Sequence, residues 1–452
     1  MEESDLKIEK LKAKSNPFHF SLFTFNFQLS TSRAVVINQL FRFLSGLSFQ
    51  IFLTHSALNA VQVGVFETII FAWVSISFFW VNAYINIVLV FLSNSKFEKS
   101  NTETFLARQF IFTSALNFIG AIVFSLVFSP QIFQTAPFVF LFWGAQIFLN
   151  ATNFIEPKLI AENKPNKIFE FGVLNLLLPY ILLGLLIFFG ANTFYAVGIF
   201  LGFSIFVFLI FMIQHLRYKD SNFNIKKIRT EFLKSVSPLI AYAATNNITT
   251  IFTQGIVLEL YKLQADKFAI YRYGVRELPF TLAITNGFGF SAIGSLHSVN
   301  DLAHFREGSK KILLQIFFIT WLLLLTSRWT IPFIFSNKFS ASISFFNLNL
   351  LLVLSRALMP QIILRAKNAQ LSILYAGIAE TIFIIILSVI LAPKFGAMGI
   401  LFSVVVGFIF EKIVLAIILK TKFNISLKNY TPIGYYVVLS FFTLLLYLWV
   451  TL

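Results

Sequence analysis

Long apolar runs, separated by short polar segments, make up most of the chain. About thirteen runs are long enough to cross a bilayer, and they fall at 34–53, 62–92, 105–128, 137–162, 168–189, 193–217, 233–259, 266–294, 310–334, 340–364, 371–391, 397–419 and 432–451. A transmembrane helix needs about 20 mainly apolar residues, so each run predicts one such helix. The pattern predicts an all-α polytopic membrane protein of about 13 transmembrane helices, which allows two six-helix bundles around a central cavity plus one extra C-terminal helix.

The composition excludes a soluble protein. Of the 452 residues, 58% are hydrophobic and 12% are charged, and the mean hydropathy is +0.82, whereas soluble domains carry about 25% charged residues. The chain has no cysteine, which excludes disulfides, thiolate metal sites and cysteine nucleophiles. It also has no GxxxxGK loop, which excludes a P-loop ATPase. We expect no cofactor, no metal site and no catalytic group.

The net charge of +16 is a signal of topology. With the amino terminus in the cytoplasm, 25 lysines and arginines fall on the inner side and only five on the outer side, namely Lys262, Lys267, Arg328, Lys338 and Lys394. Cytoplasmic loops of membrane proteins carry such an excess. We therefore expect a multi-pass protein of the cytoplasmic (inner) membrane with its amino terminus inside, and no nucleic-acid partner.

The chain is expected to divide into two lobes. The longest inner connection, RYKDSNFNIKKIRTEF, runs from Arg217 to Phe232 and follows six predicted spans. FGANTFYAVGIFLGFSIFVF from Phe189 and FGAMGILFSVVVGFIF from Phe395 form a faint repeat, as expected for parallel lobes with a binding site at their interface. Five parts are predicted: a cytoplasmic or interfacial N-terminal segment (1–33), a six-helix N-terminal lobe (34–217), a cytoplasmic linker (218–232), a six-helix C-terminal lobe (233–419), and a loop with an extra transmembrane helix (420–452).

Two arginines lie in the first half of the apolar run at 266–294. Arg272 and Arg276 are four residues apart, so on a helix they share one face and repel each other. An arginine at mid-membrane costs about 2.5–3.5 kcal/mol on insertion scales, and such residues usually face a bundle interior or a water-filled cavity. Pro279 interrupts the helical hydrogen bonds beside them. These features predict the wall of a cationic cavity that can change shape, with both lobes built around it.

Other charged side chains also lie inside predicted spans. Arg42 is either paired with an acid such as Glu67 or Glu277, or available to a phosphate, to which a guanidinium donates two hydrogen bonds. Arg356 either lines the inner vestibule or extends toward the inner interface. Glu380 is a candidate proton or cation relay, or else the partner of Arg356.

A turn in the second half of the chain resembles that of a known family. LAPKFGAMGILFSV, from Leu391, resembles the hairpin between the eleventh and twelfth helices of polysaccharide flippases, O-antigen flippases among them, in the multidrug/oligosaccharidyl-lipid/polysaccharide exporter (MOP) superfamily. LQADKFAIYRYGVRELPFTLA and NKFSASISFFNLNLLL are similar to the eighth helix and to the entry of the tenth. The resemblance covers most of the second half and the six-plus-six layout. The chain departs from the family in its thirteenth span and in Glu380, where an amide or small residue is more usual.

The resemblance implies a function and a site. It implies alternating access between the lobes and transfer of a polyprenyl-diphosphate-linked oligosaccharide from the cytoplasmic to the outer leaflet. Arg42, Arg272 and Arg276 would then line the cavity and meet the diphosphate. Arg356 is a further candidate for substrate binding, and Glu67, Glu277 and Glu380 are candidates for coupling or pairing. The implied partners are the lipid-linked sugar, membrane lipids and glycan-assembly proteins. The glycan, the oligomeric state and any coupling ion, Na+ or H+, stay open.

Two other functions are compatible with such a chain. A cation-coupled multidrug exporter of the same fold would favour an acidic cavity, whereas the spans here hold five cations against Glu67, Glu277, Glu380 and Glu411. A membrane glycosyltransferase or polymerase needs an acidic catalytic pair and usually a sizeable outer loop, and the sequence shows neither. We therefore expect a transporter and not an enzyme.

Overall fold

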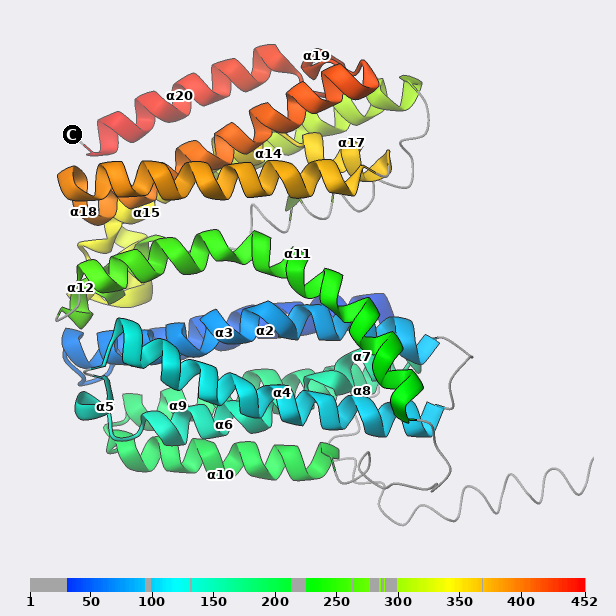
Figure 1. The fold of residues 1–452 in the computed structure, drawn as a ribbon. Coiled ribbons are helices and arrows are strands. Elements are labelled where there is room, and N and C mark those ends of the chain that lie inside the picture. Colours follow the sequence, from blue (N-terminus) through cyan, green and yellow to red (C-terminus); the bar gives the residue numbers. More distant parts are fainter. Residues whose placement is uncertain are drawn as a thin grey trace, which may run out of the picture.

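The described part of the fold is entirely helical (Figure 1). The computed structural model describes residues 31–93, 99–130, 132–212, 225–261, 264–276, 284–285, 288, 299–367 and 369–451. Eight helices in these ranges are long and apolar enough to cross a membrane, or nine if one pair bent by 43° counts as a single span. The prediction of an all-α polytopic membrane protein is confirmed.

The first six predicted spans all correspond to helices, but two of them are interrupted. The continuous helices are α2 (Thr31–His55), α3 (Ala60–Ser93), α4 (Lys99–Phe128) and α10 (Thr193–Met212). After the short α5 (Ile132–Thr135), the fourth span consists of α6 (Val139–Ala151), the 3-10 turn η1 (Thr152–Phe154) and α7 (Ile155–Ala161). The fifth consists of α8 (Pro165–Phe171), the π-helical η2 (Gly172–Leu177) and α9 (Leu178–Phe188).

Two prolines explain the interruptions. Pro157 cannot donate a backbone hydrogen bond to Asn153, four residues earlier, and Pro179 cannot donate one to Asn175. In each span the backbone carbonyl of an asparagine therefore lacks its usual α-helical hydrogen bond. Irregular turns of this kind are common at functional sites.

The second half of the described chain contains long and broken helices. Its elements are α11 (Ile225–Leu260), α12 (Ala265–Gly274), α14 (Val299–Phe335), η3 (Asn337–Phe339), α15 (Ser342–Leu350), α16 (Val353–Arg356), α17 (Pro360–Ala366), α18 (Gln370–Phe423), α19 (Leu427–Tyr430) and α20 (Ile433–Thr451). α18 covers two predicted spans, at 371–391 and 397–419. They are two helices joined at a sharp turn at Gly396, where φ is 57°. Glycine adopts this left-handed conformation at no steric cost, which explains its place in the predicted hairpin.

The predicted linker at 218–232 is helical in the part that the structure describes. α11 begins at Ile225, and residues 218–224 lie outside the described ranges. Phe232 is fully buried, with its ring centroid 5.2 Å from that of Tyr84 and 5.6 Å from that of Phe105. The amino-terminal end of α11 is therefore packed against α3 and α4.

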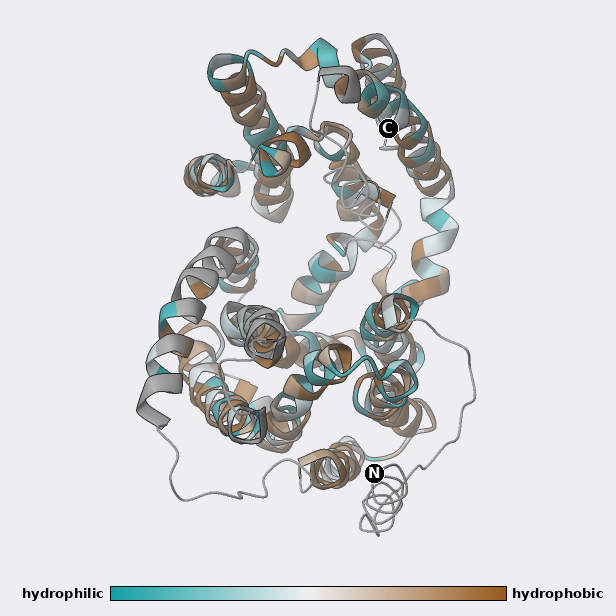
Figure 2. Cartoon of the chain, turned by 90° about the vertical axis from the view of Figure 1, so that its right-hand side faces the viewer, coloured by the Kyte–Doolittle hydropathy of each residue, from teal (hydrophilic) through white to brown (hydrophobic). Residues whose placement is uncertain are grey.

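The helices form two groups with α11 and α12 between them (Figure 1). α2 to α10 make one group, and α14, α18 and α20 belong to the other. α11 packs against both α3 and α18, and α12 against both α3 and α15. Viewed along the helices, the two groups occupy the lower and upper halves of Figure 2. α5 and η3 lie at the end that the charge pattern assigns to the outside, which we call the outer end.

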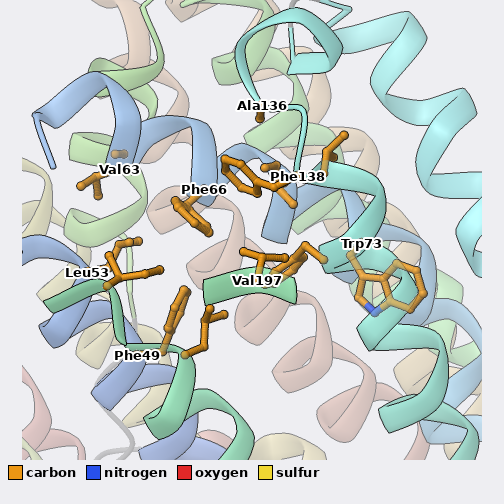
Figure 3. Packing of buried hydrophobic residues seen from close by; sticks show 14 of the residues in the cluster. Phe49, Leu53, Val63, Phe66, Trp73, Ala136, Phe138 and Val197 are labelled. Atoms are coloured by element: carbon orange, nitrogen blue, oxygen red, sulfur yellow. The ribbon is translucent and has the colours of Figure 1, made fainter. Parts of the chain in front are cut away.

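A core of aromatic and aliphatic side chains holds the first group together (Figure 3). Phe49 of α2 and Phe66 of α3 are buried, and their ring centroids lie 6.0 Å apart. Phe66 also stacks on Phe138 at 4.8 Å. The indole nitrogen of Trp143 donates a 3.1 Å hydrogen bond to the Ile69 carbonyl. α2, α3 and α6 are thereby fixed to one another around the inward-facing polar residues described below.

α3 and α12 cross closely at Gly64. A Cβ atom on Gly64 would lie 2.0 Å from the carbonyl oxygen of Ala265. Gly64→Ala is therefore expected to destabilise the protein by about 1–3 kcal/mol through overpacking. Gly198→Ala on α10 is the matched control, because a Cβ there meets no atom within 4 Å; it should be neutral or gain up to about 1 kcal/mol in helix propensity. Thermal melting of the two purified variants checks this, and equal melting would contradict the close crossing.

The predicted extra helix is α20, which packs against α14. The indole nitrogen of Trp321 donates a 2.8 Å hydrogen bond to the Thr443 hydroxyl. The Tyr436 hydroxyl donates a 2.9 Å bond to the Leu354 carbonyl, in the broken segment α15–α17. Non-helical backbone inside a membrane has to be satisfied by protein. α20 therefore supplies a hydrogen-bond donor to a backbone carbonyl of the broken span in the second group.

Candidate functional site

One face of α2 carries or meets four of the five charged residues of the candidate site, Arg42, Glu67, Glu156 and Arg276. Asn38, Arg42, Gly46 and Gln50 are each four residues apart, so they follow one another along that face. Asn38 and Arg42 contact Glu156. Gly46 lies beside Arg276, just beyond α12, and Gln50 contacts Glu67 of α3. α2 therefore connects the two parts of the site.

Glu67 of the first helix group binds Arg272 of α12, the helix that lies between the groups. Glu67 on α3 is fully buried, and its Oε2 accepts a 2.8 Å hydrogen bond from the Arg272 Nε of α12. Its Oε1 accepts a 2.8 Å bond from the Gln50 amide. The Arg272 Nη1 donates a 2.6 Å bond to Gln254 of α11. The result is a buried, charge-assisted network that joins α2, α3, α11 and α12.

Aromatic rings flank Arg272 as well. Its guanidinium carbon lies 5.3 Å from the centroid of Phe71 and 5.8 Å from that of Phe268. Cations at this distance from a ring face are attracted by its quadrupole. Arg272 is therefore held in a fixed position by ionic, polar and aromatic contacts together.

Arg276 lies just beyond the end of α12, against α2. A Cβ atom on Gly46 would lie 3.1 Å from the Arg276 Nη2, so the absence of a side chain at Gly46 makes room for the guanidinium. Arg276 interacts electrostatically with Glu67 and Arg272. Within the described ranges no residue accepts a hydrogen bond from the Arg276 guanidinium. Its donors therefore remain available to an anion.

The backbone beside Arg276 is packed tightly. The Tyr273 ring stacks on Phe335 at 4.6 Å with an interplanar angle of 10°. A Cβ atom on Gly274 would lie 2.3 Å from the Cβ of Phe345 and 2.8 Å from the Ser342 carbonyl oxygen. Arg276 is therefore presented from a backbone held by α14 and α15 rather than from a loose loop.

Arg42 forms a second ion pair, with Glu156 of α7. Glu156 is buried, with 2% of its surface exposed, and also accepts a 2.6 Å hydrogen bond from the Asn38 amide. One of the two alternatives that the sequence left for Arg42 was pairing with an acid such as Glu67 or Glu277; the acid that it meets is Glu156, and Glu67 lies farther along α2 at Gln50. Glu277 lies outside the described residues. The Arg42 Nε is buried without a hydrogen bond in the described part, so the guanidinium keeps a donor.

Arg356 and Glu380 lie apart from this network. Glu380 on α18 is buried, and its charged neighbours are Glu411 and Lys412. The Lys412 ammonium lies 2.5 Å from the Glu411 carboxylate. Arg356 is the last residue of α16 and lies at the break before α17. The structure therefore groups Glu380 with Glu411 and Lys412.

The candidate site carries excess positive charge. Three arginines (Arg42, Arg272 and Arg276) meet two carboxylates, Glu67 and Glu156, among the described residues. Sequence reasoning found the arginines because charges stand out in apolar runs. It missed Glu156, Gln50 and Gly46, although the four-residue spacing along α2 was a usable signal for the last two. No group of His, Cys, Asp or Glu within the described ranges could hold a metal ion.

The outer ends of the two groups are joined by Lys338. Its ammonium, on η3, donates hydrogen bonds to the carbonyl oxygens of Ser56 at 2.8 Å, Leu58 at 2.9 Å and Thr54 at 3.4 Å. These carbonyls belong to the end of α2 and the loop after it. A cation is favourable at a helix C-terminus. Lys338 therefore ties η3 to the end of α2 and the α2–α3 loop at the outer end.

Comparison with known proteins identifies the fold. No protein-family model matches the sequence, and no curated protein matches it. The lipid II flippase MurJ, in an inward closed conformation, aligns with 91% of this chain and 92% of its own at a TM-score of 0.67 and 16% identity. A MOP superfamily transporter from Pyrococcus furiosus aligns with 89% of this chain and 97% of its own, at a TM-score of 0.54 and 13% identity.

A MATE transporter has the same architecture. The MATE transporter VcmN of Vibrio cholerae aligns with 87% of this chain and 99% of its own, at a TM-score of 0.52 and 15% identity. These matches extend along nearly the whole length of both partners, so they concern the complete helical arrangement and not one bundle. The chain is a multi-pass membrane protein with the transporter fold of the MOP superfamily, which MurJ and the MATE transporters share.

Proposed function

We propose that the protein moves a polyprenyl-diphosphate-linked oligosaccharide across the cytoplasmic membrane, from the inner to the outer leaflet, by alternating access. The observation that carries this proposal is the excess of arginine over carboxylate between two helix groups of a MOP fold. Arg42 and Arg276 keep donors that no described residue uses. Guanidinium groups bind phosphate oxygens through charge-assisted, often paired, hydrogen bonds. An anionic headgroup therefore suits the site better than an organic cation.

Exchange of counter-ions would couple binding to movement. Glu67 lies in the first helix group and Arg272 on α12, which also packs against α15 of the second half, so their ion pair fixes α12 to the first group. A diphosphate offers several anionic oxygens and could accept from Arg272 and Arg276 at once. Its arrival would release Glu67 from Arg272 and weaken the link between α3 and α12. A ligand shifts a conformational equilibrium only through such a difference in affinity for the two states.

The cluster of Glu380, Glu411 and Lys412 supports a place for the coupling ion. Two carboxylates and one ammonium leave one negative charge in a buried position on α18. A proton or Na+ would neutralise that charge. Carboxylates inside membrane helices often act as such relays. We assign coupling to Glu380 and substrate contact to the arginines, and we expect membrane lipids and glycan-assembly proteins to supply and accept the substrate.

Ligand-dependent stabilisation tests the proposed substrate class. A ligand that binds only the folded state at 100 times its dissociation constant stabilises a protein by about 2.7 kcal/mol. A polyprenyl-diphosphate-linked oligosaccharide should therefore raise the melting temperature of the purified protein. An organic cation of the kind that drug exporters carry should not. Stabilisation by the organic cation alone would favour the multidrug exporter instead.

Crosslinking at the outer end tests the proposed alternation. In Asn59→Cys/Asn337→Cys, a thiol crosslinker should join the α2–α3 loop to η3, because Lys338 already touches the Leu58 carbonyl. Transport should stop, since the outer ends can no longer separate, and cleavage of the crosslinker should restore it. The chain has no cysteine of its own, so only the introduced pair reacts. Full transport by a verified crosslinked protein would contradict alternating access.

A further inference from the structure

The fourth span carries a row of polar side chains that extends beyond the arginine site. Gln146, Asn150, Asn153 and Glu156 follow one another at spacings of four, three and three residues. The 3-10 turn η1 has three residues per turn, so it helps to bring Asn150, Asn153 and Glu156 onto one line. The row begins at Glu156, which binds Arg42, and runs toward the outer end. It therefore connects directly to the proposed phosphate site.

Two amides in this row are incompletely hydrogen-bonded. Gln146 accepts a 2.8 Å bond from the Tyr180 hydroxyl. The Asn153 Nδ2 donates a 3.3 Å bond to the Asn150 Oδ1. This leaves the Asn150 Nδ2 and the Asn153 Oδ1 buried with no partner in the described part of the chain. Buried polar groups without a partner are rare in native proteins, so one donor and one acceptor here call for an occupant.

The amide pair lies at the depth of the arginines. On the fourth span, Asn153 and Asn150 are about 5 and 9 Å farther out than Glu156, at 1.5 Å per residue. On α2, Gly46 is about 6 Å farther out than Arg42 by the same measure, and Gly46 is the residue that faces the Arg276 guanidinium. A molecule whose diphosphate reaches Arg42 and Arg276 would have the groups next to the diphosphate at the level of Asn150 and Asn153.

We propose that Asn150 and Asn153 bind hydroxyl groups of the sugar next to the diphosphate. This rests on the proposed function and adds where the glycan lies. A sugar hydroxyl both donates and accepts a hydrogen bond, which matches the Asn153 Oδ1 acceptor and the Asn150 Nδ2 donor. The pair is uncharged, so it suits hydroxyls and has no charge with which to hold a phosphate or an organic cation. The amides thus distinguish a glycosylated lipid from a bare one.

The test compares two lipids in reconstituted vesicles. One is a polyprenyl diphosphate that carries a short neutral oligosaccharide, and the other is the same lipid without sugar. Asn150→Ala and Asn153→Ala should each slow flipping of the glycosylated lipid about three- to tenfold, the range that one neutral hydrogen bond supports. Flipping of the bare lipid should be unchanged. Asn117→Ala is the matched control, because that buried amide already bonds Trp80 and the Trp73 carbonyl; it should lower thermal stability and leave the ratio of the two lipids unchanged.

The other outcomes overturn one claim each. Equal slowing of both lipids, or no slowing of either, would mean that the amides only support the fold or hold a water molecule, and the glycan proposal would be wrong. Failure of the wild-type protein to flip either lipid would overturn the proposed function itself. Because the bare lipid reports on the arginine site alone, the two failures can be told apart.

Discussion

Replacing Arg276 with alanine is expected to slow flipping of a lipid-linked oligosaccharide about ten- to a hundredfold, because a hydrogen bond to a charged group contributes about 1.5–3 kcal/mol. Thermal stability should stay close to that of the wild type, since Arg276 makes no hydrogen bond to Glu67 in this conformation. Arg276→Lys should recover only part of the loss, because lysine keeps the charge without the paired donors. Flipping rates in reconstituted vesicles, together with melting curves, measure both effects.

Arg328 provides the control for loss of a positive charge. It is exposed on α14 and donates a 3.3 Å bond to the Val450 carbonyl, away from the arginine site. Arg328→Ala should flip the lipid at close to the wild-type rate. Normal transport by Arg276→Ala, or loss of transport explained by instability, would show that Arg276 is a structural residue.

Removing either partner of the Glu67–Arg272 pair is expected to destabilise the protein strongly. Glu67 is fully buried, and loss of one member of a buried ion pair costs about 3–5 kcal/mol because the other charge is left unpaired. The total free energy of unfolding of a folded protein is only about 5–15 kcal/mol. Glu67→Ala and Arg272→Ala should therefore both melt at much lower temperature than the wild type.

The double variant separates pairing from independent roles. Glu67→Ala/Arg272→Ala leaves neither of the two charges without its partner, so it should lose less stability than the two single changes added together. Strictly additive losses would show that the two side chains act separately and would remove the basis for counter-ion exchange. If the double variant is stable yet fails to flip the lipid, Arg272 is needed for the substrate as well as for Glu67.

The apolar pattern predicted the spans well because membrane helices need long uninterrupted apolar runs. The last run was expected at 432–451, and α20 covers Ile433–Thr451. The interruptions at η1 and η2 were not predicted, although each asparagine followed four residues later by proline carried the signal. Helical continuity depends on local hydrogen bonds, and hydropathy does not report on those.

The charged residues were easier to find than to pair. Arg42, Arg272 and Arg276 stand out in apolar sequence. The structure brings Arg42 and Arg276 to the face of α2 and links Arg272 to that face through Glu67 and Gln50. Glu156 was missed because it lies near the end of its run beside Lys158, where an acid is unremarkable in sequence. Its burial follows from the bend at η1 and the approach of α2, which are tertiary features. The partners of the arginines could therefore be identified only from the structure, whereas the excess of cations could be read from the sequence.

Transport by the wild-type protein in vesicles of defined lipid composition tests the central claim most directly. The passengers are a polyprenyl-diphosphate-linked oligosaccharide and an organic cation, each followed from one side of the membrane to the other, with Arg276→Ala run in parallel. The account predicts that the lipid-linked sugar crosses, that Arg276→Ala slows it about ten- to a hundredfold, and that the cation stays where it was placed. Movement of the cation without movement of the lipid-linked sugar would contradict it.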